Sequence, residues 1–160
     1  MTRIKRILIA TDFSDCSKEA LDYAVYLARK LGAGLYLLHV FEPPFYSLAK
    51  RSIHVPPEIY RWITDLKEDA SKRLNSLADE AHRLTAKIHP ILREGTPFLE
   101  ILKAAGEIPS DLIVLGTHGR TGLSHFLVGS VAERVLRKAS CQVFMVRLKA
   151  LKGAKKMGGT

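Results

Sequence analysis

The segment VLGTHGRTGLSHFLVGS, residues 114–130, holds the residue types best suited to binding an anion. Gly116 ends an apolar run, Gly119 follows three residues later, and Gly129 with Ser130 opens a helical pattern. Glycine lets the backbone approach a ligand closely, because it has no side chain. The first N–H groups of a helix lie at the positive end of its dipole, where they attract anions. The segment therefore predicts a site for phosphate or a similar anion.

The spacing of these glycines differs from the common phosphate-binding motifs. The sequence GTHGRTG is not G-x-G-x-x-G, and the chain contains no G-x-x-x-x-G-K-[ST], so neither the dinucleotide fingerprint nor the P-loop applies. The observed pattern is Gly116-x2-Gly119-x9-Gly129-Ser130. Ser130 also precedes Glu133 by three residues, as in a capping box, so an alternative role for its hydroxyl is to cap its own helix. The two roles are compatible, because main-chain amides can hold phosphate in either case.

Apolar runs and helical patterns alternate along the whole chain and predict an α/β fold. Runs rich in leucine and β-branched residues predict short strands, and apolar residues at gaps of three and four predict helices. Five strands separated by helices favour one parallel sheet with helices on both faces. Pro90 places its strand at an edge of that sheet, because proline cannot donate a ladder hydrogen bond. The expected strands are 6–11, 33–41, 87–95, 111–116 and 142–148, and the expected helices are 16–31, 59–84, 97–108 and 130–139.

The expected elements also locate the site. In parallel α/β sheets, ligands bind beyond the carboxyl ends of the strands where the winding reverses, so we expect the site in the loops after the first, second and fourth strands. Ser14 or Asp15 is suited to cap helix 16–31, and Gly32 is suited to end it. We expect His39, inside a strand, to be a hydrogen-bonded core residue.

Composition indicates one soluble globular domain. The chain has 160 residues, of which 47% are hydrophobic and 26% are charged. No apolar run is long enough to cross a bilayer, and the N-terminus lacks a signal-peptide pattern, so we expect a cytoplasmic location and no membrane partner. The two cysteines, Cys16 and Cys141, form no metal-binding or redox motif and are expected to pack in the core.

The formal net charge of +9 raises the question of nucleic-acid binding. Five basic residues lie within the last fourteen positions, where there is no acid. No aromatic residues alternate with them to stack on bases. We therefore expect residues 149–160 to form a basic, disordered tail, and we do not expect nucleic acid to be the partner.

Three parts of the sequence together resemble the ATP-binding branch of the universal stress protein family. They are the glycine motif, the opening ILIATDFSDCSKEALDYAVYLA (7–28) and the closing GSVAERVLRKASCQVFMVR (129–147). The resemblance extends over residues 4–148 in matching element order. It implies a single Rossmann-like, adenine nucleotide alpha hydrolase-like domain at 1–148, with strand order 3-2-1-4-5. It further implies a homodimer through the last strand, at Val143 to Val146, and an unpaired apolar strand there would be an exposed edge.

The resemblance also implies roles for particular residues. Asp12 would contact the adenosine part of the nucleotide, and the main chain of Val40 would read the adenine edge. Gly116 and Gly119 would line the ribose and phosphate. Gly129, Ser130 and Val131 would bind the phosphate chain, and Thr11 and Leu115 would be further neighbours of the site. To these we add Arg120 as a clamp on the phosphates.

The sequence leaves two main classes of function open. The first is a regulatory switch protein that holds ATP, or else AMP or ADP, with Mg²⁺ or Mn²⁺ and changes its dimer or its contacts with an unknown protein partner. The second is a phosphohydrolase or nucleotidyl transferase acting on adenine nucleotides. Hydrolysis requires an activated water and stabilisation of developing charge, and we find no clear pair of acids beside His118. We assign no catalytic residue and expect at most slow hydrolysis. A flavin or electron-transfer domain is a more distant third interpretation.

Overall fold

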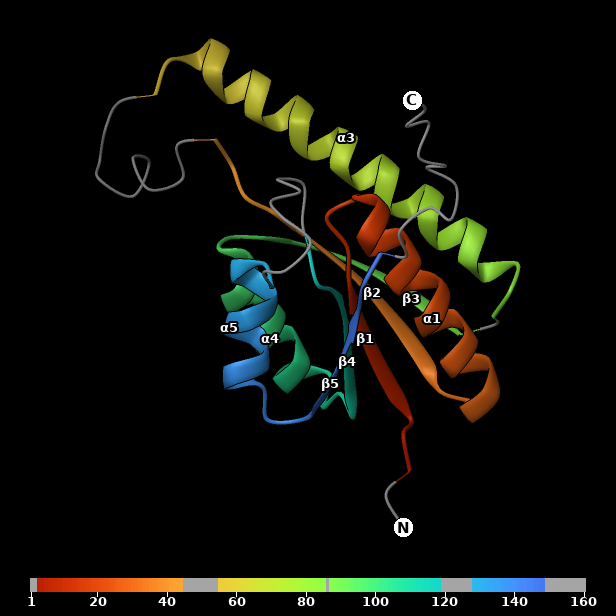
Figure 1. The fold of residues 1–160 in the computed structure, drawn as a ribbon. Helices are drawn as coiled ribbons and strands as arrows, with labels where there is room; N and C mark the ends of the chain where they lie inside the picture. The colour runs from red at the N-terminus through yellow and green to blue at the C-terminus, as the bar shows by residue number, and fades with distance from the viewer. Residues whose placement is uncertain (1–2, 45–54, 86, 119–127, 149–160) are drawn as a thin grey trace, which may run out of the picture.

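Five parallel strands form one sheet in the order β3-β2-β1-β4-β5 (Figure 1). The computed structural model describes residues 3–44, 55–85, 87–118 and 128–148. This order confirms the expected parallel α/β fold. The strands are β1 Arg6–Ala10, β2 Gly34–Phe41, β3 Ile88–Glu94, β4 Leu112–Gly116 and β5 Gln142–Val146, and the helices are α1 Asp15–Leu31, α3 Pro57–His82, α4 Pro97–Glu107 and α5 Ser130–Lys138.

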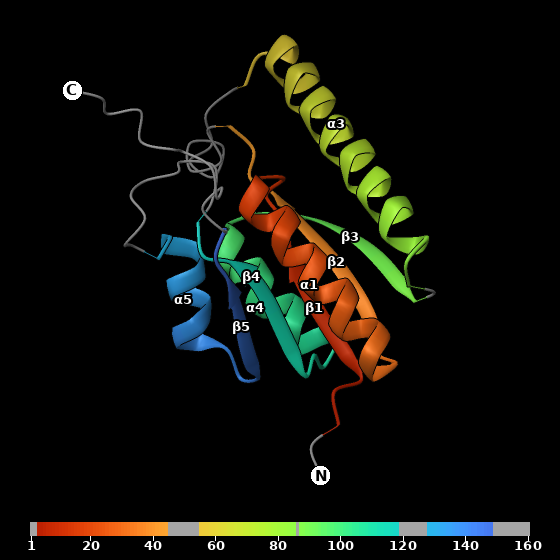
Figure 2. The same cartoon turned by 45° about the vertical axis from the view of Figure 1, so that its right-hand side comes forward.

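Helices cover both faces of the sheet, as expected (Figure 2). α1 and α3 pack on the face that carries Ile7 and Ile9 of β1. α4 and α5 pack on the opposite face, where Leu8 points. Successive side chains of a strand point to opposite faces, so the central strand is buried on both sides and these three side chains are inaccessible to solvent. Burial of this apolar surface joins the sheet to both helical layers.

The edge position of Pro90 is confirmed, and the hydrogen-bond pattern explains why it is tolerated. β3 is an outer strand, and Pro90 lies beside Leu37 of β2. The carbonyl of Lys87 accepts a hydrogen bond from the N–H of Leu35, so Lys87 faces β2. The backbone N–H and C=O groups of successive residues point alternately to the two sides of a strand. Those of Pro90, three residues after Lys87, therefore point away from β2. The N–H that proline lacks would have faced outward, so no ladder bond is lost.

The ends of α1 carry the expected caps. Ser14, and not Asp15, is the N-cap, because its side chain accepts a hydrogen bond from the N–H of Ser17. Gly32 ends the helix in the left-handed region, with φ of 64°, and its N–H bonds to the carbonyl of Ala28. These caps fix where the chain leaves β1 and where it enters β2.

The N-terminal end of α3 reaches past the carboxyl ends of the strands (Figure 1). All of its buried residues lie in the second half of the helix, from Ala70 onward. Among the described residues, no helix has both the length and the apolar character needed to span a membrane. The basic tail expected at 149–160 lies outside the part of the chain that the structure describes.

Candidate functional site

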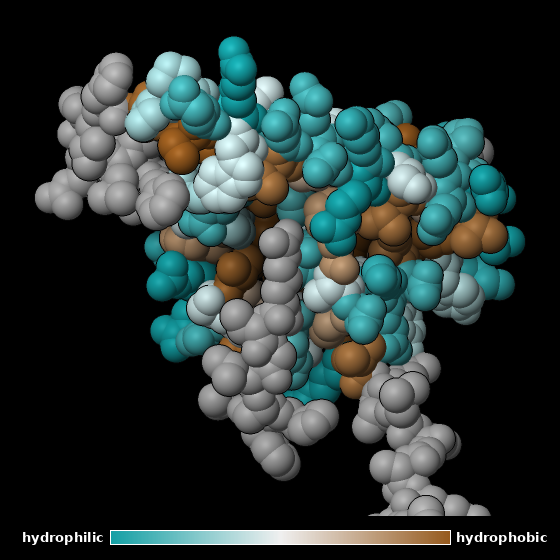
Figure 3. All heavy atoms as spheres, turned by 90° about the horizontal axis from the view of Figure 1, so that it is seen from above, coloured by the Kyte–Doolittle hydropathy of each residue, from teal (hydrophilic) through white to brown (hydrophobic). Residues whose placement is uncertain are grey.

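A cavity of about 850 Å³ opens at the carboxyl edge of the sheet, around the ends of β1, β2 and β4. The winding of the chain reverses between β1 and β4, which is where ligands bind in folds of this type. Figure 3 views this edge from above, with brown apolar side chains visible between the polar ones of α3. Gly119 and Arg120 of the expected site lie outside the described residues. The other expected site residues all line the cavity: Thr11, Asp12, Val40, Leu115, Gly116, Gly129, Ser130 and Val131.

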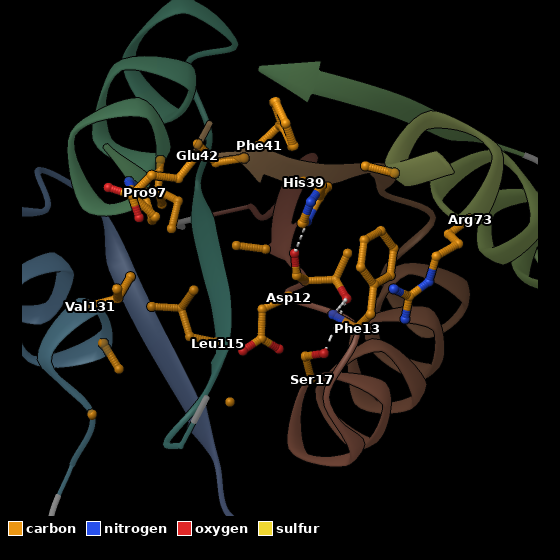
Figure 4. A pocket seen from close by; sticks show the side chains of 18 of the residues that line it. Asp12, Phe13, Ser17, His39, Phe41, Glu42, Arg73, Pro97, Leu115 and Val131 are labelled. Carbon is orange, nitrogen blue, oxygen red and sulfur yellow. Dashed lines mark hydrogen bonds between the residues drawn. The ribbon is translucent and has the colours of Figure 1, made fainter. Parts of the chain in front are cut away.

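Side-chain hydrogen bonds hold the turn that follows β1. Oδ1 of Asp12 accepts hydrogen bonds from the N–H of Ser14 at 3.0 Å and from its hydroxyl at 2.5 Å. Oγ1 of Thr11 accepts from the N–H of Phe13 at 3.0 Å and lies 3.0 Å from Oγ of Ser17. Figure 4 shows the Asp12 carboxylate directed towards the open space beside Leu115. The turn therefore presents an acidic acceptor to the cavity in a fixed orientation.

His39 and Phe13 form a packed pair beside this turn. Nδ1 of His39 is 2.8 Å from the carbonyl oxygen of Thr11, and since a carbonyl only accepts, Nδ1 carries the proton. The two ring centroids are 4.3 Å apart. His39 is buried, so its expected role as a hydrogen-bonded core residue is confirmed. Phe13 has φ of 66°, a conformation that residues other than glycine rarely adopt and that is enriched at functional sites.

The backbone N–H and C=O of Val40 point to the side of β2 on which β1 lies, but beyond the residue where β1 ends. The carbonyl of Leu38 accepts a hydrogen bond from the N–H of Thr11, so Leu38 points towards β1. Peptide groups two residues apart in a strand point the same way, and Val40 therefore also points to that side. β1 ends at Ala10, and the carbonyl of Thr11 accepts a hydrogen bond from the His39 ring. The N–H and C=O of Val40 thus lie where a planar ligand with complementary edges can pair with them.

Gly116 has a packing reason to be glycine. A Cβ at this position would lie 3.0 Å from Sγ of Cys16 and 3.1 and 3.2 Å from its carbonyl carbon and oxygen. The first turn of α1 therefore packs directly on the end of β4. Gly116 also lines the cavity. Cys16 is buried at this contact, as expected of a packing residue.

Gly129 connects the end of β4 with the start of α5. Its N–H donates a 2.7 Å hydrogen bond to the carbonyl of Thr117, and its φ and ψ of −61° and 150° make it the N-cap. Ser130 is the first residue of the helix, so the alternative role of its hydroxyl as the N-cap in a capping box with Glu133 is wrong. The carbonyl of Gly129 accepts from the N–H of Glu133 and completes the first helical bond.

This arrangement identifies the amides available to an anion. The N–H of Gly129 is already bonded, whereas the N–H groups of Ser130, Val131 and Ala132 belong to the first turn and have no partner within the helix. All three residues line the cavity. Together with the positive end of the helix dipole, they form a site of the kind that holds phosphate.

α3 supplies a wall of the cavity that we did not expect from the sequence. The guanidinium carbon of Arg73 lies 4.2 Å from the centroid of the Phe13 ring, and Figure 4 shows the two side chains facing each other. Lys72 and Asp69 of the same helix also line the cavity. Helical periodicity in the sequence shows which face of α3 is buried, but it gives no signal that Arg73 would reach a residue sixty positions earlier.

The described residues provide no ready-made metal site. Among them, no three His, Cys, Asp or Glu side chains are grouped so that they could hold a metal ion. Asp12 and His118 both line the cavity, and Nδ1 of His118 lies 2.9 Å from Oγ1 of Thr117. Mg²⁺ in nucleotide sites is commonly held by one or two carboxylates together with phosphate oxygens. The residues present fit a cation that arrives with phosphates and is contacted by Asp12.

The remaining cysteine, Cys141, agrees with the expected packing role. It lies directly before β5 and packs against the core beneath α4 and α5. Burial is the main cause that raises the pKa of its thiol, with a smaller contribution from the charge of Asp111. A raised thiol pKa makes the residue less reactive at neutral pH.

The fold and the site define the class of protein. A doubly wound parallel sheet has a cavity at its switch point, bounded by an acidic turn after β1 and by a helix start after β4. This is the architecture of the nucleotide-binding α/β proteins. Within that class, the model of the universal stress protein family matches residues 3–147. The chain belongs to this family.

Individual relatives agree with that assignment. The chain is 39% identical over 145 residues to the universal stress protein MJ0531 of Methanocaldococcus jannaschii, covering 89% of this chain and 82% of the relative. Its structure resembles that of the hypothetical protein MJ0577 of the same organism, with a TM-score of 0.80 and 28% identity, covering 93% of this chain and 99% of that one.

Two further solved structures of universal stress proteins contain adenine nucleotides. One is a complex with cAMP, with a TM-score of 0.64 and 24% identity, covering 91% of this chain and 98% of that one. The other, from Archaeoglobus fulgidus, is a complex with dAMP, with a TM-score of 0.62 and 22% identity, covering 91% of this chain and 99% of that one. At this identity the likeness shows a shared fold.

Proposed function

We propose that this chain binds an adenine nucleotide, and ATP in particular, in the cavity at the carboxyl edge of the sheet. The observation that carries the proposal is the convergence of the Asp12 turn and the first turn of α5 on one cavity. The cavity volume of about 850 Å³ is within the range of small-molecule sites, which is about 300–1,000 Å³. The cAMP and dAMP complexes of two structural neighbours support an adenine nucleotide as the ligand class.

The proposal assigns the ligand groups to the two sides of the cavity. The adenine would lie at the end of β2, where the main chain of Val40 faces past β1, with Thr11 and Leu115 as neighbours. The carboxylate of Asp12 would accept hydrogen bonds from the ribose, beside Gly116. The phosphates would lie at the start of α5, on the amides of Ser130 and its two successors. Gly119 and Arg120 belong to the proposed site on the sequence motif alone.

Mg²⁺ or Mn²⁺ is part of the proposal as a companion of the phosphates. Such a cation would neutralise phosphate charge and bridge the ligand to a carboxylate. The residue of this chain that would contact it is Asp12, whose carboxylate faces the cavity.

The role that best fits these features is regulatory binding. Tight, oriented binding requires only donors and acceptors in place, whereas rapid hydrolysis also requires a base positioned on water and charge stabilisation. The competing proposal, a phosphohydrolase or nucleotidyl transferase, draws on Asp12 and His118, which line the same cavity. Turnover above about 1 s⁻¹, an ordinary enzyme rate, would favour the enzyme over the switch.

The proposal is tested by identifying the ligand and then removing its site. Protein purified without added nucleotide is denatured, and the released small molecules are identified by mass spectrometry. ATP, ADP and AMP are then titrated by calorimetry.

Gly129→Val places a branched side chain at the cavity in a conformation that valine adopts without strain. We expect it to lower ATP affinity more than about tenfold, or about 1.4 kcal/mol, with unchanged circular dichroism. The control is Gly106→Val, where a Cβ meets no atom within 4 Å. Unaltered ATP affinity in Gly129→Val would refute the site.

A further inference from the structure

A second cleft, of about 390 Å³, lies at the opposite edge of the sheet, where the strands begin. Its lining comes from the residues leading into β1, from the turn between α1 and β2, and from the start of β3. Four lining residues, Arg3, Lys5, Arg6 and Lys87, are permanently positive, and no lining residue is acidic. The sequence analysis did not identify this cluster, because its members are separated by about eighty residues along the chain.

Backbone hydrogen bonds fix the two sides of this cleft. The N–H of Gly34 donates to the carbonyl of Lys5 at 2.8 Å, and the N–H of Leu35 donates to the carbonyl of Lys87 at 2.7 Å. The start of β2 is therefore held between the two lysines. Gly34 has no side chain, so the floor between them stays open. A positively charged surface is thus built on a rigid part of the sheet.

The basic residues that line the cleft outnumber the acidic ones beside them. Within the ranges that the structure describes, no acidic side chain lies within ion-pair distance of these four basic side chains. The carboxylate of Asp111 accepts the backbone N–H groups of Lys5 and Arg6 at 2.8 and 2.9 Å, and the positive charges of both residues also help to lower its pKa. Nε of Arg6 donates to the carbonyl of Pro109 at 2.9 Å, which anchors the guanidinium. Four basic residues therefore line a cleft that has one carboxylate beside it, which the backbone already engages.

The helix dipole of α1 accounts for only part of this cluster, although the end of α1, at Leu31 and Gly32, lines the cleft. The carboxyl-terminal ends of helices are negative, and basic residues in the last turn stabilise them. α1 already carries Arg29 and Lys30 in its last turn. The cations of the cleft belong instead to the β1 segment and to the residue before β3. Their convergence requires another reason, and a bound anion supplies one.

We propose that this cleft is a second binding site, specific for a small anion that carries two or more phosphate groups. Several phosphate oxygens can meet several separated cations at once, which a single carboxylate cannot do. The cleft volume is within the lower range of small-molecule sites. The rings of Tyr36 and His89, stacked with centroids 4.9 Å apart, also line the cleft. The phosphates are the shared chemistry, whether they belong to free pyrophosphate or to a larger molecule.

The test uses pyrophosphate as the probe and a variant pair with equal net charge. Lys5→Gln with Lys87→Gln removes two cations from the cleft. Lys18→Gln with Lys103→Gln removes two exposed lysines that line neither cavity. We expect the first double variant to lose more than about tenfold in pyrophosphate affinity, and the second to change it less than about twofold, because screened surface charges contribute little. In NMR spectra, the amide resonance of Gly34 should shift when pyrophosphate is added to the wild type and to the second double variant.

Three outcomes would overturn the proposal. The first is equal loss in both double variants, which would reflect net charge alone. The second is a wild-type titration in which pyrophosphate leaves the Gly34 resonance unmoved. The third is tighter binding of a single-stranded oligonucleotide than of pyrophosphate, with loss in the same variant, since this would make the cleft part of a nucleic-acid surface. Titration of AMP, which carries one phosphate, into the cleft variants separates the two sites, because neither lysine lines the cavity at the carboxyl edge.

Discussion

The N–H of Gly129 donates a 2.7 Å hydrogen bond to the carbonyl oxygen of Thr117. This bond joins the first turn of α5 to the end of β4, although twelve positions separate the two residues. It occupies the amide of Gly129 and leaves those of Ser130 and its successors facing the cavity. The glycine thus positions the helix start, and the following residues provide the donors.

Ser130→Ala tests the proposed phosphate side of the cavity. Ser130 is the first helical residue and not the N-cap, so loss of its hydroxyl should leave the melting temperature unchanged. We expect ATP affinity to fall by about tenfold, with a smaller loss for AMP, since a hydrogen bond to a charged group contributes about 1.5–3 kcal/mol. Calorimetric titration with both nucleotides measures the difference. Equal losses for ATP and AMP would contradict a contact with the terminal phosphates.

Asp12 has a structural and a proposed binding role, and two substitutions separate them. Asp12→Asn keeps an oxygen that can accept the Ser14 hydrogen bonds, whereas Asp12→Ala removes it. We expect both variants to bind nucleotide at least about tenfold more weakly. Only Asp12→Ala should also lose about 1 kcal/mol of unfolding free energy, because it leaves the Ser14 donors unpaired. Normal nucleotide affinity in Asp12→Asn would rule out the binding role of the carboxylate.

Gly116→Ala tests the contact between β4 and α1. The added Cβ would lie within 3.2 Å of backbone atoms of Cys16, which cannot rotate away. We expect the unfolding free energy to fall by about 1–3 kcal/mol, as for other overpacked sites. The control is Gly34→Ala, whose Cβ would meet its nearest atom at an ordinary 3.6 Å. If denaturant titration found the two variants equally stable, the packing explanation for Gly116 would be wrong.

Asp111 should contribute to the pH dependence of stability. The backbone N–H groups of Lys5 and Arg6 hold the pKa of its carboxyl below its usual value. A carboxyl whose pKa is lower in the folded state stabilises the fold above the pKa of the unfolded chain, about 3.9, and loses that contribution as the pH falls through the folded pKa. Asp111→Asn should therefore be less stable than the wild type at pH 7, with a difference that shrinks below about pH 4. A difference independent of pH would contradict this assignment.

We expect the chain to form a homodimer through β5. β5 is an outer strand whose Phe144 is 39% exposed, and an unpaired edge of this kind promotes association. The carbonyl of Val146 accepts a hydrogen bond from the N–H of Thr117, so the backbone groups of Val146 face β4. Backbone groups alternate in direction along a strand, and those of Val143, three residues earlier, therefore face outward. Val143→Pro should therefore weaken the dimer without breaking the ladder to β4.

Light scattering at micromolar concentration tests the dimer, with circular dichroism as the check on folding. Phe144→Pro is the matched control, because its N–H faces β4 and its loss should destabilise the fold itself. A monomeric wild type would overturn the prediction.

Local features of the fold could be predicted from the sequence because they depend on neighbouring residues. Alternating apolar runs and helical periods set the order of strands and helices. Pro90 marked an edge strand, and Gly32 marked a helix end, since each acts through its own backbone geometry. The expected cluster at the carboxyl edge followed from the rule that parallel strands end on the same side. These signals predicted the architecture, which the structure confirms, and they predicted a candidate site at the carboxyl edge.

The role of each residue at the site depended on contacts between distant parts of the chain. Ser130 fits a capping box in the sequence, but the bond from Gly129 to Thr117 moves the N-cap one residue earlier. In the sequence, Arg73 is indistinguishable from other residues on a helix surface. Only the packing of α3 brings its guanidinium onto the Phe13 ring. The same holds for the cationic cleft, whose lysines meet only through β-sheet pairing. A sequence determines periodicity and backbone preference locally, whereas packing decides which donors, charges and rings face one another.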